Sequence, residues 1–197
     1  MIRRIRRPQP LFLALAGAAI AVIGVACGDL TAVPASLPTL SDSGVVYAIN
    51  GAPPGAPTAL EMFSATLISA DANFIFDVAF DIDSAGNVVV LPQHVVASSL
   101  AVTHSVALQV SDSSFDAITK APKNGYRADT SVVTRPGKVV LVQSADANAC
   151  SVSITGSTIV AKLVIVAVDP LTRKMNIRFT VDPNCGFLSF VPGVPKE

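Results

Sequence analysis

Three cysteines carry the covalent chemistry that this sequence offers, and the first of them stands apart. Cys27 ends an apolar run and directly follows small residues in the tetrapeptide Gly24-Val25-Ala26-Cys27. This pattern is typical of a bacterial lipoprotein signal, in which cleavage before the cysteine leaves an acylated N-terminus. The sequence therefore predicts lipidation of Cys27 and, through the lipid, attachment to a membrane.

The segment before Cys27 has the layout of an export signal. Four arginines within the first seven residues form a basic start, and residues 11–26 form an uninterrupted apolar run. As a helix this run of 16 residues would rise about 24 Å, short of the ~30 Å hydrocarbon core of a bilayer. Gly24 departs from the aliphatic residue that is usual three positions before the cysteine, so a permanent transmembrane anchor and an ordinary cleaved signal stay open. We expect an exported protein on the periplasmic or outer-surface side of a bacterial envelope.

Acylation of Cys27 would leave two of the three cysteines, Cys150 and Cys185, available to pair with each other. In an oxidising envelope such a pair is expected to form a disulfide. The chain-entropy model gives this cross-link about 3–4 kcal/mol of stabilisation. Two buried free thiols are the alternative. Neither cysteine has a histidine or a second cysteine at ligand spacing, so we predict no metal site.

The two histidines, His94 and His104, lie ten residues apart in the segment PQHVVASSLAVTHSVAL. Each is most simply a surface or loop residue, and the alternative is that both bind one ligand. The chain has no nucleophile elbow, no glycine-rich phosphate loop and no zinc-binding His-Glu-x-x-His motif. We expect a non-catalytic protein that binds an unidentified protein or small molecule or has a structural role. An envelope hydrolase with an unrecognised site is the alternative.

A possible calcium loop lies at Asp81, Asp83, Gly86 and Asn87, where several oxygen-bearing side chains surround a turn. Ala85 occupies a position that needs an oxygen ligand, and the distal glutamate of a calcium loop is missing. We therefore expect an ordinary hairpin turn.

Alternation of apolar and polar residues dominates the chain and is typical of β-strands. In residues 74–83 the even-numbered positions are apolar and share one face, whereas Asp77, Asp81 and Asp83 lie on the other. This predicts a half-buried strand with an acidic exposed face, which forms a hairpin with residues 88–91. Further strands are predicted at 45–49, 59–68, 106–111, 139–143, 151–155, 159–168 and 175–181, with a hairpin turn at 169–173.

These strands predict an all-β fold, an antiparallel sandwich or barrel-like domain. Only residues 92–100 could form a short helix. Residues 50–57 hold three prolines and two glycines and are expected to form a surface loop. The predicted organisation is a signal peptide at 1–26, a lipidated N-terminus with a Pro/Ser/Thr-rich flexible tether at 27–43, and a single β domain at 44–197.

Charge excludes one class of partner and divides the chain into two halves. Without residues 1–26 the chain keeps ten basic and 14 acidic residues, so a nucleic-acid partner is not expected. No lysine or arginine occurs from residue 8 to residue 119, whereas residues 120–197 hold ten. Pairing between strands of the two halves would bring opposite charges together. The alternative is a polarised surface that docks a partner.

Several short runs, in the same order, resemble segments of the HmuY-like haem-binding lipoproteins. FDVAF at 76–80 is similar to a Trp-Asp-Leu-Ala-Phe-like strand of that family, with Phe76 in place of the tryptophan. FDAITKAP at 115–122 and GYRAD at 125–129 resemble its middle segment, and VVLVQS at 139–144 and AKLVI at 161–165 its final strand pair. The resemblance implies an all-β domain and, as in some members, haem or a similar planar ligand held between two side chains, often histidines. His94 and His104 are the only histidines available for this role.

Overall fold

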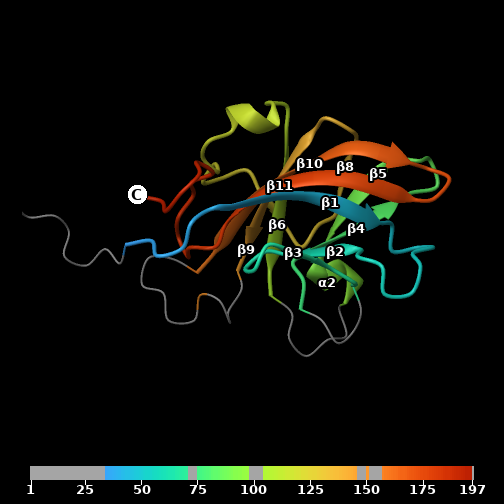
Figure 1. Ribbon diagram of the computed structural model, residues 1–197, viewed down its shortest axis with the longest axis horizontal. Coiled ribbons are helices and arrows are strands. Elements are labelled where there is room, and N and C mark those ends of the chain that lie inside the picture. The colour runs from blue at the N-terminus through green and yellow to red at the C-terminus, as the bar shows by residue number, and fades with distance from the viewer. Residues whose placement is uncertain (1–33, 71–74, 98–103, 146–149, 151–156, 197) are drawn as a thin grey trace, which may run out of the picture. The chain divides into compact units, whose positions relative to one another are not determined.

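The computed structural model describes residues 34–70, 75–97, 104–145, 150 and 157–196. All of them belong to one compact unit, Val33–Glu197. In this unit two antiparallel β-sheets pack as a sandwich (Figure 1), which confirms the predicted all-β class. Cys27, the signal segment and the predicted strand at 151–155 lie outside the described residues.

The larger sheet has six strands in the spatial order β1, β11, β10, β9, β6, β7. Their bounds are β1 Leu40–Tyr47, β6 Val106–Ser111, β7 Arg127–Ala128, β9 Val139–Ser144, β10 Ile159–Asp169 and β11 Lys174–Asp182. The smaller sheet has five strands in the order β3, β2, β4, β5, β8. Their bounds are β2 Ala59–Glu61, β3 Thr66–Ile68, β4 Val78–Ile82, β5 Val88–Pro92 and β8 Val132–Thr134.

Two short helices complete the described structure. The α-helix α2, Gln93–Val96, follows β5 directly and lies where a short helix was expected. The 3-10 helix η3, Phe115–Ala117, comes after β6 and was not predicted. Among the described residues, no helix is both long and apolar enough to cross a membrane.

The main core lies between the two sheets because alternate side chains of each strand point inward. Leu108, Leu163 and Phe179 reach it from the six-stranded sheet, and all three are fully buried. Leu60 and Phe80 reach it from the five-stranded sheet. Period-two patterning therefore produces the packing that the sequence predicted.

The outer face of the six-stranded sheet is covered as well. Val160 and Val164 on β10 pack there against Phe115 of η3 and Phe190 near the C-terminus. This second apolar layer explains why β10 reads as an almost continuous apolar run, since strands buried on both faces lose their alternation.

Lys162 is buried within this outer layer. Its Nζ donates hydrogen bonds to the carbonyls of Phe115 at 2.7 Å and Ile118 at 2.8 Å, and lies 4.3 Å from the centroid of the Phe115 ring. Burial lowers the pKa of Lys162, while the nearby Asp116 carboxylate opposes this shift. The lysine thus fastens η3 to the sheet by polar contacts inside an apolar layer.

Opposite charges from the two halves of the chain do meet. In the described part of the chain, every ion pair of a lysine or arginine joins an acid before residue 120 to a base after it. These pairs are Arg173 with Asp81 at 3.0 Å, Arg178 with Asp116 at 2.6 Å, and Lys138 with Asp112. The charge division of the sequence therefore reflects contacts within the fold.

The prediction of one strand at 59–68 is wrong, because this segment forms the hairpin of β2 and β3. Glu61 accepts hydrogen bonds from the backbone N–H groups of Phe63 at 2.7 Å and Ser64 at 2.9 Å. Ala65 has a left-handed φ of 54° and completes the turn. Local bonds from a side chain to the backbone thus reverse the chain inside an apolar pattern.

The predicted faces of Phe76 and Asp77 are also wrong. Asp77, expected on an exposed acidic face, is only 2% exposed. Phe76, expected beside Val78, packs instead with Ala59 and Ala79 in a separate cluster. The regular alternation fails here because β4 begins only at Val78, so the two residues before it are not bound to the pleat.

The two predicted hairpin turns are present. Gly86 has a φ of 84° in the turn between β4 and β5, and Asp83 Oδ1 accepts the N–H groups of Ala85 at 2.9 Å and Asn87 at 2.8 Å. The Asp83 carboxylate thus closes the turn, as expected for an ordinary hairpin. The second turn joins β10 to β11.

The folded domain begins before the predicted boundary at residue 44. β1 starts at Leu40, inside the segment predicted as tether, and pairs along its whole length with β11. Upstream of it, Asn184 Oδ1 accepts the N–H groups of Ser36 and Leu37, each at 3.0 Å. The partners are more than 140 residues apart in sequence, so local composition gave no sign of this pairing.

Asp182 lies beside this anchor at the end of β11 and is fully buried. Its Oδ1 accepts the backbone N–H of Asn184 at 3.0 Å and the side-chain amide of Asn184 at 2.8 Å. Burial raises the pKa of Asp182, and its hydrogen bonds with Asn184 and with the Ser189 N–H oppose the shift.

Candidate functional site

The free edge of β6 lies at an open place between the two sheets. β7 pairs with β6 only at Ala107 and Leu108. The chain then leaves the six-stranded sheet and enters the five-stranded sheet as β8, beside β5. Because β7 is antiparallel to β6 and begins only at Arg127, opposite Leu108, residues 109–111 of β6 have no paired strand on this side in the described structure.

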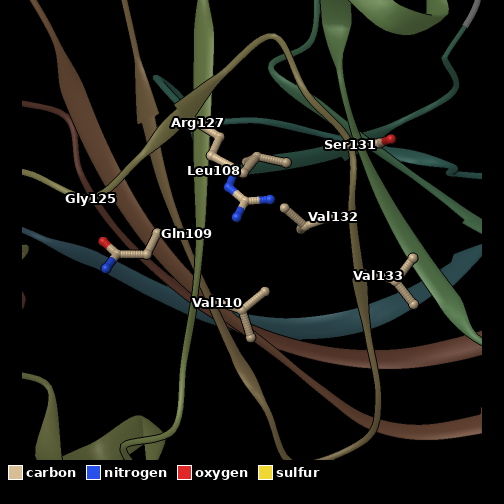
Figure 2. Close-up of a pocket in the computed structure, with 8 residues that line it drawn as sticks. All are labelled: Leu108, Gln109, Val110, Gly125, Arg127, Ser131, Val132 and Val133. Atoms are coloured by element: carbon tan, nitrogen blue, oxygen red, sulfur yellow. The ribbon is translucent and has the colours of Figure 1, made fainter.

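A cavity of about 550 Å³ lies between β6 and β8 (Figure 2). Figure 2 shows the Arg127 guanidinium in the space between β6 and the segment that carries Val132. The lining residues come from β6, from the segment around β7, and from the start of β8. They are Leu108, Gln109, Val110, Gly125, Arg127, Ser131, Val132 and Val133.

A second cavity of about 280 Å³ continues the first along β8. The two share Val110 and Val133, and the second extends to Arg135 and Lys138 in the turn after β8. We call the two cavities together the β6–β8 groove. Its shared middle is apolar, and it has cationic residues at both ends.

The apolar middle of the groove is accessible to solvent. Val110 is 42% exposed and Val133 is 59% exposed. Val110 continues the row of Val106 and Leu108, which are both fully buried in the core between the sheets. The row of β6 side chains that faces the core therefore continues into the groove at Val110.

The cations of the groove are only partly neutralised. Lys138 pairs with Asp112, and its hydrogen bond holds the pKa of Asp112 below the usual value. Arg127 and Arg135 are exposed, and neither is in direct ion-pair contact with an acid among the residues described, although the charge of Arg135 also helps to lower the pKa of Asp112. The groove therefore has an excess of positive charge, although the predicted mature chain is acidic overall.

Gln109 forms part of the groove wall beside Gly125. Its Oε1 is buried and has no hydrogen-bond partner in the part of the chain described. A Cβ at Gly125 would lie 2.8 Å from Gln109 Nε2, and Gly125 has a φ of 97°, so this position suits only glycine. The absence of a side chain at Gly125 lets the segment before β7 lie close to the Gln109 side chain.

A second polar site, the Asp77 cluster, lies inside the protein and consists of Asp77, Gln93, His104 and Ser144. Asp77 Oδ1 accepts His104 Nε2–H at 2.8 Å and the Ser144 hydroxyl, and Oδ2 accepts the Met62 N–H at 2.6 Å. Because a carboxylate can only accept, Nε2 of His104 carries the proton. All four cluster members are buried.

The order of groups in this cluster differs from that of a hydrolase triad. In a triad the imidazole lies between the hydroxyl and the carboxylate, where it can take the hydroxyl proton. Here the Asp77 carboxylate lies between Ser144 and His104. The arrangement supplies a buried carboxylate with three hydrogen-bond donors, which is what a structural polar cluster requires.

The two histidines singled out by sequence have different surroundings. His94 is exposed on α2, whereas His104 is buried and bonded through Nε2 to Asp77. Neither lines the β6–β8 groove. An axial bond to haem iron from His104 Nε2 would first have to break the bond to Asp77, and the haem interpretation stays a prediction.

The predicted disulfide is present. Cys150 and Cys185 are bonded, with their Cα atoms 5.6 Å apart. In the described ranges, no group of three or more His, Cys, Asp or Glu side chains is placed to hold a metal ion.

Comparisons with known proteins identify no relative of this chain. No protein-family model matches this chain, and no curated protein or solved structure matches it. The resemblance to HmuY-like lipoproteins therefore stays a prediction.

Sequence reasoning missed the groove as a site. In the sequence, Arg127 is part of the run at 125–129 that resembles the HmuY-like family, and neither β7 nor β8 was predicted. Strands of two and three residues are too short to show alternation. The available signal was Gly125, followed two residues later by an arginine in a chain with few cations.

Proposed function

We propose that this chain is a lipid-anchored protein of the bacterial cell envelope, which binds a partner in the β6–β8 groove and catalyses no reaction. The groove is the observation that carries the binding role. There the apolar row of β6 emerges from the core at Val110, beside Arg127 and its unneutralised charge. Accessible apolar surface with a few convergent polar groups is what ligand sites require.

The disulfide supports the envelope part of this proposal. With Cys150 and Cys185 joined, Cys27 is the remaining cysteine of three, and it lies at the end of the signal-like segment. Disulfides persist in oxidising compartments, of which the bacterial envelope is one. Cys27 is thus the residue proposed to carry the lipid.

Mass spectrometry of the mature N-terminus tests the anchor. We expect the protein from the membrane fraction to begin at Cys27 and to carry diacylglycerol, and the Cys27→Ser variant to lose both features. An unmodified N-terminus, or a chain that keeps residues 1–26, would overturn the proposed anchoring.

An activity screen tests the non-catalytic role. The purified mature protein would be incubated with ester, glycoside and peptide substrates. We expect no turnover above that of the buffer. Reproducible turnover that a single substitution abolishes would defeat the binding role in favour of an envelope hydrolase.

A further inference from the structure

We infer that the β6–β8 groove accepts an extended acidic segment of a partner polypeptide, which adds to the free edge of β6 as a further strand. The inference rests on the proposed binding role of the groove and names the chemistry of its occupant. Backbone direction, side-chain alternation and charge lead to it independently.

Among the described residues, β6 keeps the backbone N–H and C=O of one residue, Val110, without a strand partner on its β7 side. The Val106 carbonyl accepts the Asp129 N–H at 2.9 Å, and the Val106 N–H donates to Asp129 Oδ1 at 3.0 Å, so the peptide groups of Val106 face β7. Groups two residues apart on a strand face the same edge. Those of Leu108 therefore meet Arg127 in β7, and those of Val110 point into the groove beyond the end of β7.

Side-chain alternation shows what an added strand would bury. Val106 and Leu108 are core residues, and Val110 continues their row but is 42% exposed. Val132 is partly buried and packs against the same core. An apolar side chain placed opposite Val110 would extend the core between the sheets, as a regular strand in this position would.

The charges select an acidic segment. Arg127 lies at one end of the groove, and Arg135 and Lys138 lie at the other. Asp112, already paired with Lys138, is the acid that faces this end. A segment with an apolar centre and an acidic residue on each side would match this pattern. At about 3.3 Å per residue, the three residues of β8 and their flanks match a segment of roughly five residues.

Peptide binding to the mature protein tests the inference. The probe is a fluorescently labelled hexapeptide with alternating valine and threonine in its centre and an aspartate or glutamate at each end. One control peptide has lysines in place of the acids, and a second carries an N-methyl group on a central amide. We expect both changes to weaken binding at least tenfold, the first through charge and the second through the lost strand pairing.

Matched protein variants locate the site. Arg127→Glu should weaken binding of the acidic peptide at least tenfold. Lys120→Glu should leave it unchanged, because Lys120 is an exposed cation in the segment that pairs with Ser189, outside the groove. Equal binding of the acidic and lysine peptides, equal binding of the N-methylated peptide, or no binding at all would overturn the inference.

A further experiment distinguishes failure of the acidic-strand inference from failure of the proposed binding role. In it, a photo-crosslinking residue replaces Val133 in the full-length protein in cells. A cross-link to another polypeptide without any peptide binding would leave the groove as a binding site and reject the acidic strand. No cross-link and no peptide binding would reject both. A cross-link to a second copy of this chain would replace the inferred partner by self-association and overturn the inference.

Discussion

The Asp77 cluster and the β6–β8 groove both place polar groups against apolar surface, but they treat those groups in opposite ways. In the cluster, one buried carboxylate takes hydrogen bonds from a backbone N–H, a hydroxyl and an imidazole. In the groove, Arg127 and Arg135 stay exposed beside exposed valines, and no acid among the described residues pairs with them. A buried polar group has to be satisfied within the fold, whereas an exposed one beside apolar surface can be satisfied by a partner. The difference assigns stability to the first region and recognition to the second.

Removal of the Asp77 carboxylate should produce the largest effect. Asp77→Ala leaves the Met62 N–H, the Ser144 hydroxyl and His104 without their buried acceptor. We expect the free energy of unfolding to fall by about 3–5 kcal/mol, since unsatisfied buried donors cost their full desolvation. Urea denaturation measures this change.

Asp42→Ala is the matched control, because Asp42 is exposed and accepts only the N–H of its neighbour Ser43. It should change the free energy of unfolding by less than about 0.5 kcal/mol. A similar loss in both variants would contradict the structural role of the Asp77 cluster.

Loss of the disulfide should be the next largest effect. It lies at the end of the sheet that carries Ser144, since Ser144 pairs with Ile159, and Val160 pairs with Asp182. The bond closes a sequence separation of 35 residues, for which the chain-entropy model gives about 3–4 kcal/mol. The double variant Cys150→Ser/Cys185→Ser should lose this stability in urea. Wild type in excess reductant should lose the same amount, and equal midpoints for variant and oxidised wild type would refute the prediction.

Asp182 should make stability depend on pH in a direction unusual for a carboxylate. Burial raises the pKa of Asp182, so the folded state holds its proton more tightly than the unfolded state. Stability from this group therefore rises as pH falls through the folded pKa toward the usual 3.8. Asp182→Asn removes this gain in stability. The free energy of unfolding of the variant, relative to that of wild type, should therefore be lower at pH 4.5 than at pH 7.

Asp169 provides the control, because its pKa is lowered where that of Asp182 is raised. Its hydrogen bond from Thr172 lowers the pKa of Asp169, so its contribution is lost only as pH falls below the usual 3.8. Asp169→Asn should show a constant difference from wild type between pH 7 and pH 4.5. Parallel behaviour of the two variants in urea denaturation would disprove the assignment to Asp182.

Arg127→Ala should have the smallest effect on stability. The side chain is exposed and makes no ion pair with any described residue, so the free energy of unfolding should change by less than about 0.5 kcal/mol. Thermal unfolding measures this. A loss of 2 kcal/mol or more would make the arginine a structural residue and remove the contrast with Asp77.

The fold class was predictable because long strands carry their own pattern. β10 shows a long apolar run, β11 alternates apolar with polar residues, and the turns at Gly86 and after Asp169 show the usual turn residues. β2 and β3 were merged because the turn between them depends on Glu61 bonds that hydropathy does not record.

The sites were less predictable because they depend on contacts between distant segments. Asp77 meets Ser144 across 67 positions of sequence, so its burial could not be inferred from a strand that alternates aspartate with apolar residues. Arg127 faces the groove because the chain changes sheets between β7 and β8, a change that a single sequence does not encode locally.

If Cys27 carries the lipid as proposed, the amide of Asn184 has a mechanical consequence. This amide forms hydrogen bonds with the backbone of Ser36 and Leu37, which precede the first strand. Next along the chain, Thr39 forms an isolated β-bridge with Gly193. A force applied to the N-terminal segment would therefore act on these few hydrogen bonds before it acted on the pairing of β1 with β11. Under the proposed anchoring, tension from the membrane would break the contacts around Asn184 before it changed the register between β1 and β11.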